Sequence, residues 1–96
     1  MPAFVLAEVK VNDPEAYQKY IDQVPATIEA HGGRYLARGG EVEILDAHRS
    51  PERLVIVEFE SMERAREWWN SEVYQGPKAI REAAAVSRIV LLDGLG

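Results

Sequence analysis

The chain contains no cysteine among its 96 residues. This absence excludes disulfides, thiolate catalysis, zinc–thiolate sites and iron–sulfur ligation in one step. It is also consistent with a reducing compartment. The two histidines, His31 and His48, have no clear third ligand, so we expect no metal site and no other cofactor. His48 is predicted to be a solvated residue of a polar loop.

Clustered positive charge is missing as well. The formal net charge is −5 and the arginines are scattered along the chain, so nucleic acid is not an expected partner. The first apolar stretch lacks a preceding basic region, and Glu8 and Lys10 interrupt it. We therefore expect neither a signal peptide nor a membrane span, no membrane partner, and a cytoplasmic location. No catalytic triad, phosphate loop or dinucleotide fingerprint is present.

The composition is that of an ordinary globular domain. Hydrophobic residues make up 47% of the chain and charged residues 28%. Ninety-six residues are enough for one core without metal or disulfide support, so residues 1–96 are predicted to form a single domain.

Alternating and continuous apolar patterns predict four main strands. Ala3–Val11 and Arg53–Phe59 are apolar on both faces, which is typical of central strands. Arg34–Arg38 is a short strand, and Gly39-Gly40 after it predicts a bend or bulge. Residues 41–45 are expected to continue or re-enter the sheet, residues 46–52 to form a loop, and residues 86–92 to form the last strand.

Cap residues and apolar stripes predict the helices. Asp13 and Pro14 begin the first helix, Gly32 lies just past its end, and Pro25 is expected to kink it near Ile21. Its buried stripe consists of Tyr17, Tyr20, Ile21, Val24 and Ile28.

Ser61 is predicted to cap a second helix, whose buried side would contain Met62, Ala65 and Trp69. Residues 71–77 are expected to form a turn, and residues 77–85 a short third helix.

The order β-α-β-β-α-β predicts a ferredoxin-like α+β fold, with a four-stranded antiparallel sheet and helices on one face. The uncovered face would carry Phe4, Leu6, Leu54 and Ile56, a patch too apolar to remain exposed to water. We therefore expect a homodimer through the sheet faces.

Three segments carry a resemblance to a known family. They are AHGGRYLARGG at residues 30–40, Val57-Glu58-Phe59 followed by Ser61-Met62 and Ala65, and SEVYQ at residues 71–75. With them the chain resembles a bacterial family, described as a domain of unknown function, in the dimeric α+β barrel superfamily. That superfamily includes cofactor-independent quinol-type monooxygenases, isomerase-like proteins and stress-response domains. The resemblance therefore implies a fold and a dimer but no single function.

Three residues are candidates for catalysis, each with a structural alternative. His31 could serve as a general acid or base, or cap the end of the first helix. Arg38 could hold a carboxylate or enolate oxygen, or form an ion pair with a strand carboxylate. Glu58 could be an acid or base with a perturbed pKa, or pair with Arg38, Arg53 or the partner subunit. Arg53 itself is assigned a structural role.

Three further residues are candidates for substrate binding. Trp69 and Tyr74 could line a pocket for a planar ligand, or belong to the core. Arg81 could reach the same pocket, or point to solvent. The sequence thus predicts a small cofactor-independent enzyme, monooxygenase- or isomerase-like, that acts on a small planar organic molecule. The alternative is a non-catalytic dimeric ligand-binding or stress-associated domain.

Overall fold

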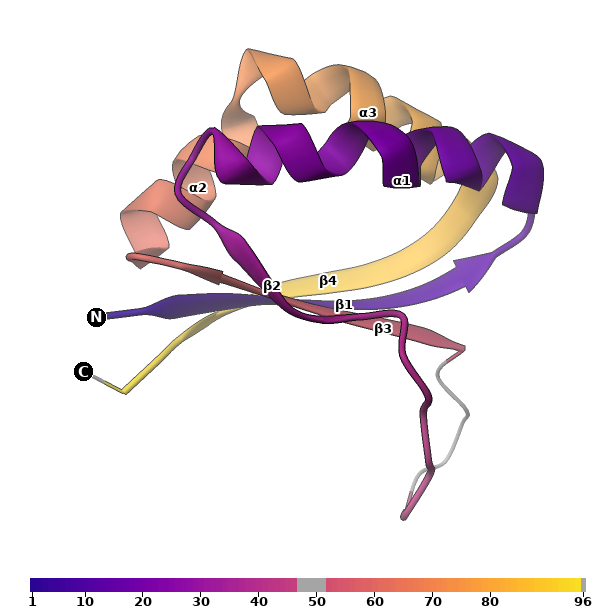
Figure 1. The fold of residues 1–96 in the computed structure, drawn as a ribbon, viewed down its shortest axis with the longest axis horizontal. Helices are drawn as coiled ribbons and strands as arrows, with labels where there is room; N and C mark the ends of the chain where they lie inside the picture. The colour runs from indigo at the N-terminus through magenta and orange to yellow at the C-terminus, as the bar shows by residue number, and fades with distance from the viewer. Residues whose placement is uncertain (47–51, 96) are drawn as a thin grey trace.

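The computed structural model describes residues 1–46 and 52–95. Its elements, in chain order, are β1 (Ala3–Val11), α1 (Pro14–Glu29), β2 (Arg34–Arg38), β3 (Arg53–Phe59), α2 (Met62–Asn70), α3 (Glu72–Ala84) and β4 (Ala85–Asp93). The strands form one antiparallel sheet in the order β2-β3-β1-β4. All three helices cover the same face of this sheet (Figure 1). The predicted ferredoxin-like α+β fold is confirmed.

Helix α1 begins and ends as its sequence predicts. The Asp13 carboxylate accepts a hydrogen bond from the Ala16 amide at 3.1 Å, and Pro14 occupies the first turn. Gly32, just past the helix, has a φ of 74°, a conformation that other residues rarely adopt. The predicted buried stripe is also present, although Ile21 is only half-buried.

Two local predictions are wrong. Residues 41–45 form no strand, because the chain leaves the sheet after the turn at Gly39. The predicted bend is present at Gly39, and a separate β-bulge lies between Tyr35 and Ala37. Residues 72–77 are helical rather than a turn, because α3 starts at Glu72 and Pro77 falls inside it. Helix α1 continues through Pro25, and the kink near Ile21 stays a prediction. Of the predicted loop at 46–52, residues 47–51, including His48, lie outside the described residues.

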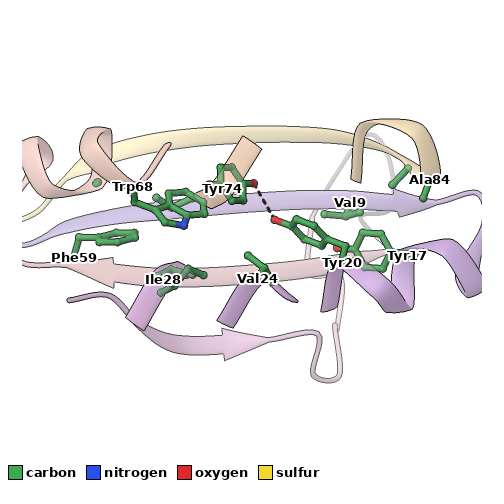
Figure 2. Close-up of a cluster of buried hydrophobic side chains, with 13 residues drawn as sticks. Val9, Tyr17, Tyr20, Val24, Ile28, Phe59, Trp68, Tyr74 and Ala84 are labelled. Atoms are coloured by element: carbon green, nitrogen blue, oxygen red, sulfur yellow. Dashed lines mark hydrogen bonds between the residues drawn. The ribbon is translucent and has the colours of Figure 1, made fainter. Parts of the chain in front are cut away.

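An aromatic cluster fills the space between the helices and the sheet (Figure 2). The Trp68 ring lies 4.2 Å from the Tyr74 ring and 5.5 Å from the Phe59 ring, centroid to centroid. The buried tryptophan is therefore Trp68, and the predicted Trp69 is only half-buried. The Trp68 indole N–H donates to the Thr27 hydroxyl at 3.0 Å, which joins α2 to α1.

A hydrogen bond between two buried hydroxyls joins α1 to α3. The oxygens of Tyr20 and Tyr74 lie 2.9 Å apart and point toward one another (Figure 2). Buried hydroxyls need such partners, because leaving one unpaired costs about 1–3 kcal/mol. This bond and the Trp68–Thr27 bond fix the three helices relative to each other above the sheet.

The other face of the sheet is apolar and uncovered, as predicted. Leu6 of β1 lies between Ile56 of β3 and Val90 of β4 in the strand register. Phe4, Leu6, Leu54 and Ile56 are half-buried, while the edge residues Val90 and Leu92 are 44% and 56% exposed. The segment after β2 projects from the sheet on this same side, away from the helices (Figure 1).

Candidate functional site

A cavity of about 40 Å³ lies between the helix-facing side of the sheet and helices α1 and α3. Apart from aliphatic side chains, its described lining consists of three arginines and four aromatic residues: Arg38, Arg53, Arg81, Tyr17, Tyr20, Tyr35 and Trp68. The volume is enough for a few water molecules or one small functional group. It is far below the 300–1,000 Å³ of typical ligand pockets.

The charge of this cavity is unbalanced. None of the described residues that line it has a carboxylate or an imidazole. Arg81 is only 6% exposed, and its Nε has no hydrogen-bond partner. The Nε of Arg53 also lacks a partner. Buried charges in proteins are normally paired, because desolvation costs several kcal/mol per ion. The cavity is therefore a positive site without a counter-ion among its described lining residues.

Arg81 reaches the cavity because it lies on the buried face of α3. Tyr74, Pro77, Arg81 and Ala84 follow one another at helical spacing, and all four are buried. The guanidinium carbon lies 6.0 Å from the ring centre of Tyr20 and 5.8 Å from that of Trp69. These aromatic faces partly compensate for the lost hydration of the cation.

Arg53 faces the helices because β3 alternates. It has the same parity as Val57 and Phe59, both of which are buried. Its guanidinium carbon lies 5.7 Å from the Tyr17 ring centre. It also packs closely against Gly39, whose φ of 65° and missing Cβ leave the space that the guanidinium fills.

Arg38 is directed to the cavity by the β-bulge. Strict alternation would place it on the face of Arg34, but the bulge moves it opposite Val55 and onto the helix side. Its Nη2 donates to the Ile21 carbonyl oxygen at 2.8 Å. That carbonyl is free because Pro25, four residues later, has no N–H. The side chain also stacks over Tyr35, at 4.6 Å from the ring centre.

The tyrosines of the cavity remain neutral donors. Burial raises the pKa of the Tyr20 hydroxyl well above its usual value, and the neighbouring Tyr74 raises it further. Burial also raises the pKa of Tyr17, which Arg53 partly offsets, and that of Tyr35, which Arg38 partly offsets. At neutral pH each hydroxyl is therefore protonated and can donate a hydrogen bond to an anion.

Two of the predicted catalytic residues lie outside the cavity lining. His31 ends α1, where its Nδ1–H donates to the Thr27 carbonyl oxygen at 2.8 Å, the arrangement of a capping residue. Glu58 is on the uncovered face of the sheet. It accepts from Nε of Arg34 at 2.7 Å, so its partner is neither Arg38 nor Arg53. Arg38 is the predicted catalytic candidate that does line the cavity.

The predicted binding residues divide between two spaces. Arg81 lines the cavity, and Tyr74 borders it through its bond to Tyr20. Trp69 lines a second, open groove of about 290 Å³ between α2 and β4. The walls of this groove are mostly apolar, and Val5, Trp68 and Ile89 line both spaces.

Several cavity residues were not chosen from the sequence. Tyr17 and Tyr20 were assigned to the core and Arg53 to a structural role. Tyr35 was not considered, and of the pair Trp68 and Trp69, one was expected on the helix flank or at an interface. The sequence signal that could have identified such residues is an arginine on the apolar face of a strand or helix. Arg53 continues the inward parity of β3, and Arg81 continues the stripe of α3 that starts at Tyr74.

Residues 1–46 and 52–95 offer neither a metal site nor a membrane span. They contain no group of three or more His, Asp or Glu side chains that could hold a metal ion. In the same residues, no helix has the length and apolar character needed to cross a membrane.

Comparison with known sequences places the chain in a family. Residues 2–95 match the profile described as "Domain of unknown function (DUF1330)". No curated protein sequence matches the chain.

Solved structures share the fold. A protein of unknown function from Rhodopseudomonas palustris superposes with a TM-score of 0.81 at 24% identity, over 99% of this chain and 83% of that one. A dimeric ferredoxin-like protein of unknown function from Jannaschia sp. gives 0.73 at 8% identity, over 98% and 100%. SnoaB, a cofactor-independent oxygenase from Streptomyces nogalater, gives 0.67 at 9% identity, over 99% and 94%. At these identities the similarity shows the fold alone.

The bond between Arg38 and the carbonyl freed by Pro25 makes a testable prediction. We expect Arg38→Ala to lower the free energy of unfolding by about 1 kcal/mol in the wild-type chain. The loss should be smaller in a Pro25→Ala background, because the new amide N–H takes over the Ile21 carbonyl. Urea unfolding of the two single variants and the double variant measures the coupling.

The matched control is Arg64→Ala, because Arg64 pairs with Glu67 at the surface and does not line the cavity. Its effect should be the same in both backgrounds. Strict additivity of Pro25→Ala and Arg38→Ala would contradict the coupling.

Proposed function

Because the chain belongs to the DUF1330 family, as its sequence motifs predicted, and because that family's description assigns no activity, we propose a function from the site itself. We propose that the protein is a small cofactor-independent enzyme, monooxygenase- or isomerase-like, that acts on a small planar organic substrate. The observation that carries this proposal is a cavity with three arginines, aromatic walls and no carboxylate or imidazole among its described lining.

The arginines supply the electrostatic part of such a reaction. A substrate that reacts as an enolate or phenolate places negative charge on one oxygen. Guanidinium groups that are fixed in place at a partly buried site stabilise this charge more than water does. Arg38, Arg53 and Arg81 come from β2, β3 and α3, so they approach an oxygen in the cavity from three elements.

The tyrosines supply hydrogen bonds and the walls. Burial raises the pKa of the Tyr17 and Tyr35 hydroxyls. These hydroxyls are therefore protonated and act as hydrogen-bond donors, not as bases. Since the described lining contains no carboxylate or imidazole, the substrate gives its proton to water or arrives ionised. Cations at the site lower the pKa of the substrate's own acidic group, which favours both routes.

The similarity to SnoaB supports this reaction class without assigning it. That protein is a cofactor-independent oxygenase, and its fold superposes over 99% of this chain. The same fold hosts unrelated activities, so the cavity, and not the superposition, selects among them.

Turnover of a substrate panel tests the proposal. Planar quinols and β-dicarbonyl compounds would be incubated with the metal-free protein. Oxygen uptake reports monooxygenation, and an absorbance change under anaerobic conditions reports isomerisation. We expect at least one compound to react, and Arg53→Gln to lower kcat/KM by about 100-fold or more, as loss of one oxyanion donor does.

Arg64→Gln serves as the matched control, because this arginine lies outside the cavity lining. Turnover that is equal in wild type and Arg53→Gln would contradict the proposed role of the cavity.

A non-catalytic ligand-binding or stress-associated domain is the second candidate. One observation favours it: the described lining can hold an anion but has no side chain that is an obvious base at neutral pH. In that case the cavity would bind members of the same panel without converting them.

We also propose that the protein works as a homodimer in the cytoplasm, with the uncovered sheet faces packed together. The supporting observation is the apolar face formed by Phe4, Leu6, Leu54, Ile56, Val90 and Leu92. A patch of this kind marks an interface. A second copy is its simplest partner, because a two-fold axis makes one patch complementary to itself. The cytoplasmic location rests on the sequence composition alone.

Mass measurement tests the dimer. Light scattering at micromolar concentration should give twice the protomer mass of 10.8 kDa. Ile56→Glu, at the centre of the face, should shift the mass toward the protomer, because the substitution places a charge in an apolar interface. Ala83→Glu on the exposed side of α3 is the control and should leave the dimer intact. A wild-type protein that is monomeric at this concentration contradicts the proposal.

A further inference from the structure

We infer that the ligand is an organic acid whose carboxylate is held at Arg81 in the cavity, while its apolar body lies in the groove between α2 and β4. This inference rests on the proposed function and names the substrate class for the same site. The cavity alone, at about 40 Å³, has room for a carboxylate but not for a ring. The groove, at about 290 Å³, has room for the ring.

The chemistry of the two spaces is complementary. The cavity provides the buried Arg81, whose Nε has no partner, together with Arg53 and Arg38. The groove is lined by Ala65, Trp69, Leu91 and other apolar residues, with Arg66 as the one charged residue among its described lining. A molecule with a small anionic head and an apolar body satisfies both, whereas a neutral molecule leaves the guanidinium charge without a counter-ion.

Val5, Trp68 and Ile89 line both spaces and therefore lie between them. Of the three residues that line both spaces, Trp68 is fixed by its bond to Thr27 and by the rings of Phe59 and Tyr74. Ile89, in contrast, is half-buried on the edge strand β4. Rotation of the Ile89 side chain is therefore the least costly way to connect groove and cavity.

Cations at the groove favour the entry of an anion. Arg66 lines the groove, and the Lys78 ammonium lies 4.2 Å from the ring centre of Trp69. Because the net charge of the chain is −5, these cations mark the groove as a local positive path across an acidic protein. Such a path attracts anionic ligands.

Calorimetric titration with 2-naphthoate and its neutral analogue 2-naphthamide tests the inference. We expect the wild-type protein to bind the acid at least about 30-fold more tightly than the amide, as expected for a desolvated charge pair. Arg81→Gln should abolish this preference. Arg64→Gln, on the exposed side of α2, should keep it. Ile89→Ala should tighten binding of the acid several-fold, because it removes the side chain that the ligand must displace.

Circular dichroism checks that each variant is folded. Arg81→Lys keeps the positive charge and should therefore retain part of the preference for the acid over the amide. Equal affinity for acid and amide in the wild type overturns the inference, as does a preference that survives in Arg81→Gln. Failure of both probes to bind at millimolar concentration overturns it too. If turnover of neutral quinols persists in these cases, the proposed enzymatic function stands and only the acid at Arg81 is wrong.

Discussion

Positive charge inside the domain, without a carboxylate beside it, is the constraint on which the site depends. A buried guanidinium costs several kcal/mol in lost hydration, and an acidic protein has many carboxylates that could offset this cost. The described lining of the cavity contains none. Arg81 instead faces the rings of Tyr20 and Trp69, and Arg53 faces Tyr17. Aromatic faces stabilise a cation only weakly, which leaves the cavity ready to accept an anion.

The fold places these charges through ordinary local features. A proline in α1 frees the Ile21 carbonyl, and a β-bulge in β2 turns Arg38 toward it. A glycine with positive φ leaves space for Arg53. The Tyr20–Tyr74 bond (Figure 2) holds α1 against α3. It therefore helps to keep Arg81 of α3 at the cavity. Structural and functional roles therefore overlap, because the elements that close the core also position the cations.

The architecture was predictable from the sequence because periodicity reports burial. Alternation in β1 and β3, the stripe of α1 and the cap at Asp13 all agree with the structure. Errors arose where a local signal was overridden. Pro77 was taken as a helix start, but tertiary packing of α3 tolerates it in the second turn. Trp68 and Trp69 differ by one helical position, and only their packing decides which of them is buried.

The candidate site was predictable only in part. Arg38 and Arg81 were chosen and line the cavity, but His31 and Glu58 lie elsewhere. A histidine at a helix end and a glutamate within a strand attract attention because both residues titrate. Each has a local partner, Thr27 and Arg34, that spacing alone does not reveal. Tyr17, Tyr20 and Arg53 were passed over because their core-like periodicity was read as packing, whereas it placed them on the walls of a cavity.

The free energy of unfolding of Arg81→Met, measured by urea titration in a buffer free of carboxylates, tests most directly whether the charge of Arg81 is uncompensated. An uncompensated buried cation predicts that methionine, of similar length and without charge, leaves the stability unchanged or raises it. A loss of about 3 kcal/mol or more is the result of breaking a buried ion pair. Such a loss would show that Arg81 already has its counter-charge within the protein, and that the cavity is not an anion site.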